Sequence, residues 1–118
     1  MQNVRRLFEG RWGEPDEQAT YPPIRPDSRP LPIGDLGRLA ARVDELIHVP
    51  FILEEIDSYP PHNTVAWRAN WELPTGEVPF LIGEPILVFG LLDYLAGLAE
   101  ANAGKVIKRP WRNTTATV

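Results

Sequence analysis

The sequence has no cysteine and little else that metal or nucleophilic chemistry requires. Without cysteine, the chain cannot form a disulfide framework or offer a thiolate to a substrate or a metal. Its serines, Ser28 and Ser58, do not lie in the G-x-S-x-G turn of serine hydrolases. Its histidines, His48 and His62, lie in no zinc-binding motif. We therefore expect no metal, no cofactor and no enzymatic activity.

Long uninterrupted apolar runs are also missing. The N-terminal segment MQNVRRLFEGRWGEPDEQ has no apolar core of the length found in signal peptides. The longest apolar stretch, residues 78–99, is interrupted by Glu84, Pro85 and Asp93, whereas a membrane span needs about 20 nearly continuous apolar residues. We expect no signal peptide, no transmembrane segment and no membrane partner. The expected location is the cytoplasm or an assembled particle.

Positive charge is scarce as well. Lys and Arg number 12 against 16 Asp and Glu, which gives a net charge of -4. Such a chain does not attract a phosphate backbone over distance, and we expect no nucleic-acid partner. The 118 residues are 43% hydrophobic and 24% charged, which is typical of one globular domain rather than a disordered chain.

Proline, in contrast, is concentrated near the N-terminus. The segment from Gly13 to Gly34 contains Pro15, Pro22, Pro23, Pro26, Pro30 and Pro32. Because proline lacks a backbone donor and favours extended geometry in the residue before it, we predict an extended arm with no helix and no central strand. We expect a surface to hold this arm, either on its own domain or on another subunit.

The first residues predict a short helix before the arm. Val4, Leu7 and Phe8 recur at i, i+3 and i+4, which predicts an amphipathic helix over residues 1–9. The domain organisation that follows is an N-terminal helix and arm (1–34), an α+β core (35–104) and a C-terminal tail (105–118).

Two longer helices are predicted within the core. Apolar residues at helical spacing predict one helix over residues 35–48, and Pro50 prevents its continuation. The second helix covers residues 85–103, with Pro85 in its first turn and Gly104 after its last.

Three strands are predicted between these helices. Residues 51–59 favour a strand by length and flanking prolines, residues 64–73 alternate clearly, and residues 78–82 form a third strand that Pro79 places at an edge. The predicted fold class is α+β, a three-stranded antiparallel meander with two main helices packed on one face, preceded by the short helix and the proline-rich arm.

Residues 64–73 carry two contrasting faces. Trp67 and Trp71 share one face, which we interpret as the core face rather than an exposed aromatic platform. Arg68, Asn70 and Glu72 share the other, which we interpret as solvated.

An acidic cluster lies on the preceding strand. Glu54, Glu55 and Asp57 have neither a metal-ligand spacing nor a sequence context that places them in a pocket, so we assign them no catalytic role.

The helix over residues 85–103 is apolar nearly all round, which a chain this small cannot easily bury. Either the arm or another subunit covers its remaining stripe. The residues that we single out for contact with other subunits are Leu7, Phe8, Trp12, Tyr21, Pro22, Pro23, Phe89, Tyr94, Leu98 and Trp111.

Three functions remain open. The first is a non-enzymatic structural protein in a multi-protein complex, a homo-oligomer or larger assembly such as a phage head, neck or tail, held by its arm and its apolar C-terminal helix. The second is a small acidic inhibitor or immunity-type protein that binds one protein target. The third is a small ligand-binding or enzymatic domain with a pocket lined by Trp67, Trp71 and Tyr94.

Overall fold

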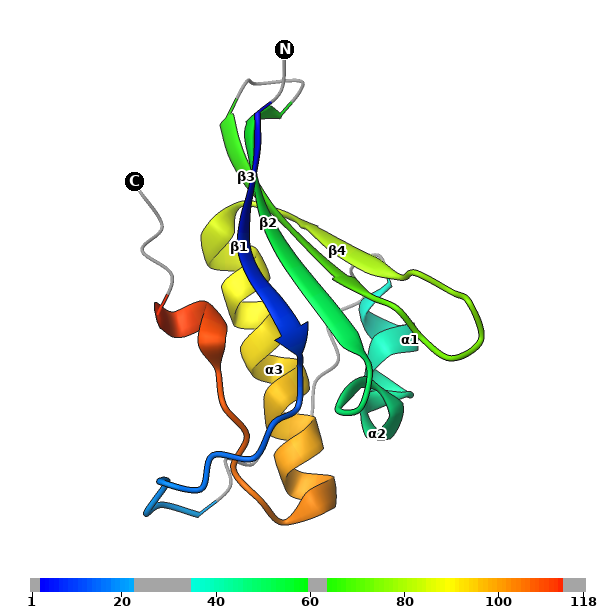
Figure 1. Cartoon of the computed structure of the whole chain (residues 1–118), viewed down its shortest axis with the longest axis vertical. Helices are drawn as coiled ribbons and strands as arrows, with labels where there is room; N and C mark the ends of the chain where they lie inside the picture. The colour runs from blue at the N-terminus through cyan, green and yellow to red at the C-terminus, as the bar shows by residue number, and fades with distance from the viewer. Residues whose placement is uncertain (1–2, 23–34, 60–63, 114–118) are drawn as a thin grey trace.

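The computed structural model describes residues 3–22, 35–59 and 64–113, and Figure 1 shows their arrangement. The elements in chain order are β1 (Val4–Arg11), α1 (Leu36–Ala40), α2 (Val43–Leu46), β2 (Pro50–Tyr59), β3 (Thr64–Trp71), β4 (Phe80–Gly83), α3 (Pro85–Ala103) and the 3-10 helix η1 (Pro110–Asn113).

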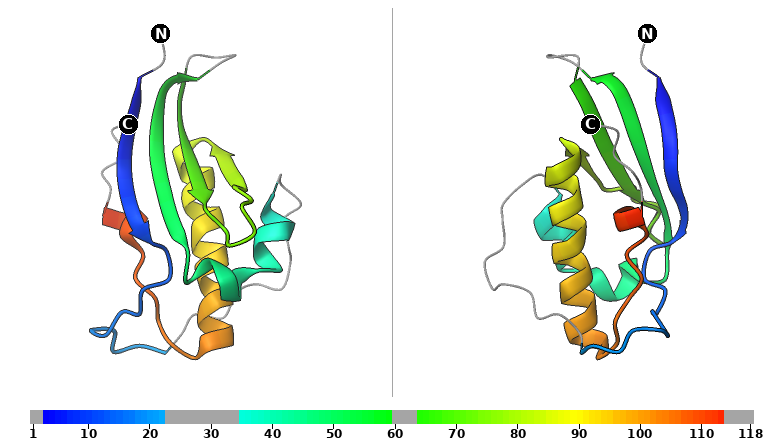
Figure 2. Two further views of the ribbon diagram at one scale, coloured as in Figure 1. Left: turned by 45° about the vertical axis from the view of Figure 1, so that its right-hand side comes forward. Right: turned by 90° about the vertical axis from the view of Figure 1, so that its left-hand side faces the viewer.

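The strands form one antiparallel meander. The sheet has four strands in the order β1-β2-β3-β4. The helices lie on one side of it, and no described helix lies on the other side (Figure 2). The predicted α+β class is confirmed. The predicted strand count and the second main helix are wrong, because the described chain has a fourth strand and only one long helix.

The fourth strand is β1, where the sequence predicted a helix. β1 pairs with β2, and its register shifts between Arg6 and Phe8. This bulge inserts Leu7, and both Leu7 and Phe8 pack against the core. Because of the bulge, two consecutive residues of the strand are apolar. Together with Val4 they give the i, i+3, i+4 spacing that is typical of a helix, and the helix predicted over residues 1–9 is therefore wrong.

The predicted helix over residues 35–48 is broken into α1 and α2. Its apolar periodicity is correct, since Leu36, Leu39, Val43 and Leu46 are all buried. Arg42 interrupts it, with φ -124° and ψ 23°. Its guanidinium pairs with Glu45 and with Glu77 from the segment before β4.

The ion pair with Arg42 also affects the titration of Glu45. The hydrogen bond from Arg42 lowers the pKa of Glu45, against a smaller opposing effect of desolvation. At the break between α1 and α2, Arg42 thus pairs with a neighbour in sequence, Glu45, and with a distant residue, Glu77. The hydrophobic periodicity of the sequence does not predict the contact with Glu77.

The remaining elements follow the sequence patterns closely. The ambiguous segment 51–59 is a strand, β2, and residues 64–71 form β3. β4 lies at the edge of the sheet, as Pro79 indicated. α3 covers residues 85–103, and Gly104 ends it in the left-handed conformation, with φ 66°.

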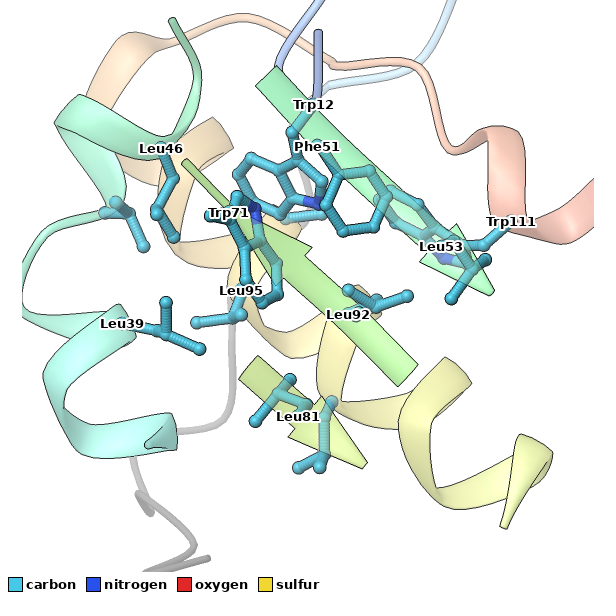
Figure 3. Close-up of a cluster of buried hydrophobic side chains, with 14 of the residues drawn as sticks. Trp12, Leu39, Leu46, Phe51, Leu53, Trp71, Leu81, Leu92, Leu95 and Trp111 are labelled. Atoms are coloured by element: carbon cyan, nitrogen blue, oxygen red, sulfur yellow. The ribbon is translucent and has the colours of Figure 1, made fainter. Parts of the chain in front are cut away.

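The core lies between the sheet and α3 and centres on aromatic rings (Figure 3). The ring of Trp12 stacks on Trp111 with centroids 6.1 Å apart. It also meets the edge of Trp71, at an interplanar angle of 74°. Trp67 and Trp71 are buried, so their face of β3 is the core face, as predicted.

The first part of the arm lies against its own chain. Residues 13–22 contain turns and a single β-bridge, between Pro15 and Ile107, and no helix. Asp16 N–H donates to the Val106 carbonyl at 2.8 Å, and Lys108 N–H donates to the Glu14 carbonyl at 2.8 Å. The rest of the predicted arm, residues 23–34, lies outside the described residues.

Gly13 provides a test of this packing. A Cβ added at Gly13 would lie 2.2 Å from the Cβ of Ile47, so one of the two segments would have to move. We expect Gly13→Ala to lower the free energy of unfolding by about 1–3 kcal/mol. The control is Gly37→Ala, because nothing lies within 4 Å of a Cβ added there. In helix α1 this change should be neutral or stabilising by up to about 1 kcal/mol. Equal denaturant midpoints for the two variants would contradict the packing described.

Candidate interaction surface

The ten predicted contact residues differ in how far they are buried in the structure. Trp12 and Trp111 are fully buried within their own chain. Leu7, Phe8, Phe89, Tyr94 and Leu98 are partly buried and pack against the core. Tyr21 and Pro22 are exposed, and Pro23 lies outside the described residues. The structure thus brings Trp12 and Trp111 together, but in the core rather than on a surface.

α3 has one face that points away from the sheet. Ile86, Gly90, Tyr94 and Ala101 share this outward face, since they recur at i, i+4, i+8 and i+15. Ile86 is 87% exposed, Gly90 and Ala101 are exposed, and Tyr94 is half-buried. None of these four residues is charged, although Asp93 at i+7 borders them and Gly97 at i+11, which lies between them around the helix, is buried.

The flanks of the outward face are covered by other parts of the chain. On one flank, the guanidinium of Arg112 lies 5.8 Å from the ring centroid of Phe89. On the other, Asn102 at the end of α3 hydrogen-bonds Asp44 of α2. Of the apolar residues predicted to remain on α3, Phe89 is therefore partly covered by its own C-terminal segment.

By length and apolar composition, α3 would be able to cross a membrane. A core helix meets the same criteria. Eight of the 19 residues of α3 are buried, among them the acidic residue Glu100. This distribution matches a helix that forms part of a protein core, which is the arrangement described above.

A buried ion pair fixes the C-terminal segment on α3. Glu100 has no exposed surface, and the Arg109 side chain is 6% exposed. Arg109 donates to both Glu100 oxygens, at 2.5 and 3.0 Å, and the Ile107 N–H donates to Oε2 at 3.1 Å. Burial lowers the pKa of Arg109, but the hydrogen bonds and charge of Glu100, with the charge of Asp93, outweigh it and raise that pKa.

Asp93 adds a second connection between α3 and the C-terminal segment. Its Oδ1 accepts the indole N–H of Trp111 at 2.7 Å, and its Oδ2 accepts from Arg112 at 2.8 Å. These bonds hold Trp111 in position against Trp12. The network around Glu100 and Asp93 is therefore a structural connection between the two ends of the chain.

A shallow pocket lies beside this network. Its lining includes Tyr21, Asp16 and the basic residues Lys108, Arg109 and Arg112. Three cations would suit an anionic ligand, but Arg109 and Arg112 are already paired with Glu100 and Asp93. The compensated charges give this pocket little attraction for an anion.

The acidic cluster on β2 is compensated in the same way. Glu54 pairs with Arg68 at 3.0 Å and Glu55 with Arg5 at 3.0 Å, and Asp57 accepts a hydrogen bond from Asn3. Within residues 3–22, 35–59 and 64–113, no group of three or more His, Asp or Glu side chains could hold a metal ion. The cluster does not form a free acidic surface.

The sequence did not single out Ile86, which at 87% has the highest exposed fraction among the exposed large hydrophobic side chains of the described residues. The available signal was its position in the first turn of an apolar helix, directly after Glu84-Pro85, where no preceding turn of the helix can cover it. Comparisons with known proteins add nothing to this picture, since no protein-family model, no curated protein and no solved structure matches the chain.

Proposed function

We propose that this protein is a non-enzymatic structural subunit of a multi-protein assembly and that the outward face of α3 contacts another copy of the chain. The exposure of Ile86 carries the proposal. A side chain of this size contributes about 1.5–3 kcal/mol when it is buried. The chain buries four tryptophans and yet leaves Ile86 in water.

Both edges of the sheet favour contact through side chains rather than through strand addition. β1 carries a bulge at Leu7 and charged residues along its length, which are features that block the pairing of edge strands. At the other edge, the Phe80 N–H donates to Asp35 at 3.1 Å. An added strand would find this donor already occupied.

The other two hypotheses have less support. An acidic inhibitor would need accessible carboxylates, but Glu54, Glu55 and Asp57 each have a partner within the chain. A ligand between sheet and helix would have to displace Trp67 and Trp71, which fill that space.

The test compares two apolar surface sites. Leu87, which is 40% exposed, lies seven residues before Tyr94 and so borders the outward face. We expect the wild-type protein to form oligomers, and we expect the double variant Ile86→Ser, Leu87→Ser to weaken their association about 10-fold or more. The matched control is Tyr21→Ser, because Tyr21 is 51% exposed and lies in neither α3 nor the sheet. Light scattering after size-exclusion chromatography gives the masses. Point substitutions suit this test, because deletion of residues 1–34 would also remove β1 and Trp12.

Two results would contradict the proposal. One is a wild-type protein that stays monomeric at every concentration. The other is an oligomer that survives the double variant as well as it survives Tyr21→Ser, since the outward face of α3 would then play no part in assembly.

A further inference from the structure

Part of the side of the sheet opposite α3 is a second open surface, next to a row in which Ile56 and Ala66 are buried. The strand registers place Glu9, Ile52, Asn70 and Phe80 in one row across β1, β2, β3 and β4. No described helix covers this outer sheet face (Figures 1 and 2). It lies on the side of the molecule opposite the outward face of α3.

A second row follows beside the first. It contains Arg6, Glu54, Arg68 and Ile82, again one residue from each strand. Their charges alternate across the first three strands. The central ion pair is well formed, since Arg68 donates to Glu54 Oε1 through Nε at 3.2 Å and through Nη2 at 3.0 Å.

The outer sheet face also exposes apolar side chains. Phe80 is 46% exposed, and Ile52 and Ile82 are half-buried. When one face of an antiparallel sheet is exposed to water, the side chains on that face are mainly polar. Apolar residues on both central and edge strands are instead typical of a face that packs against another surface.

Charge indicates which partner fits this face. The whole chain carries a net charge of -4, so two copies repel each other at most relative orientations. In the two rows, Arg6 and Arg68 balance Glu9 and Glu54, and the face has no net charge. It is therefore a surface on which two copies can meet without that repulsion.

We propose that two copies of the chain pack their outer sheet faces together around a two-fold axis that runs along the strands between β2 and β3. This axis places β2 of one copy over β3 of the other. Glu54 then lies over Arg68 of the second copy, and Arg68 lies over Glu54 of that copy. Each of these charges already has its partner within its own chain, and the symmetric contact brings one further opposite charge to each of them.

The size of the face sets the strength of the contact. Neighbouring strands lie about 4.8 Å apart, and each residue extends a strand by about 3.3 Å. Four strands of about eight residues therefore make a face of roughly 14 Å by 26 Å. Two such faces bury less than about 1,200 Å² in total, which is typical of a weak interface. The dimer therefore forms at high concentration or as one contact of a larger assembly.

The absence of cysteine makes a clean test available. Three single-cysteine variants would be treated with a short bismaleimide. Asn70→Cys reports on the outer sheet face, Ala101→Cys on the outward face of α3, and Thr75→Cys on an exposed turn outside both. We expect Asn70→Cys to yield a covalent dimer at least about tenfold faster than Thr75→Cys, because a formed contact raises the local concentration of the second thiol.

The three variants separate this inference from the proposed function. Rapid cross-linking of Asn70→Cys supports the sheet dimer whatever Ala101→Cys does. If Asn70→Cys reacts no faster than Thr75→Cys, the sheet dimer is wrong. If Ala101→Cys alone reacts rapidly in that case, assembly through α3 stands without it. Circular dichroism of each variant confirms that the fold is retained.

Discussion

Glu100→Ala is expected to lower the free energy of unfolding by about 3–5 kcal/mol. Glu100 is buried and binds Arg109 through both oxygens. Its removal leaves a guanidinium that is 6% exposed without its main counter-charge. The Ile107 N–H loses its acceptor at the same time. Urea denaturation followed by tryptophan fluorescence measures the change.

A surface ion pair and a compensated double variant serve as controls. Lys108 and Glu14 lie 3.9 Å apart and are both more than half exposed, so Lys108→Ala should cost about 0–1 kcal/mol. The double variant Glu100→Leu, Arg109→Met removes both charges and should be more stable than Glu100→Ala alone. A cost for Glu100→Ala no larger than that for Lys108→Ala would show that the buried pair does not fix the C-terminal segment.

Trp12→Ala is expected to cost about 3–5 kcal/mol, because it leaves a cavity the size of an indole ring in the core. Trp12 is the ring that joins Trp71 of the sheet to Trp111 of the C-terminal segment. Its loss should therefore also loosen Trp111. Increased accessibility of the remaining tryptophans to an aqueous quencher measures this second effect.

Tyr21→Ala is the matched aromatic control for Trp12→Ala. Tyr21 is 51% exposed, and its loss should change stability by less than about 0.5 kcal/mol. Both residues were predicted contact residues from the sequence. Equal effects of the two substitutions on the free energy of unfolding would contradict the burial that the structure assigns to Trp12.

Local patterns predicted the elements whose packing is regular. Alternation identified β3 because its tryptophans face the core and its polar residues face outward. Pro85 and Gly104 marked the bounds of α3 because they act within one turn of the backbone. β1 was missed because the bulge at Leu7 breaks the alternation on which strand prediction depends.

The burial of Trp12 and Trp111 was harder to predict than the strands and the long helix. Trp12 and Trp111 lie in proline-containing segments near the two ends of the chain, which made a surface position reasonable. Only the contact between those segments, through the Pro15–Ile107 bridge and Glu100, brings both rings into the core. Contacts between residues so distant in sequence leave no periodic signal.

Sedimentation velocity of the wild-type protein over a wide range of concentration measures directly whether the chain assembles with copies of itself, as we propose. The weight-average sedimentation coefficient is expected to rise with concentration from the monomer value toward that of a dimer or a larger oligomer. A single monomer boundary at every concentration would contradict it.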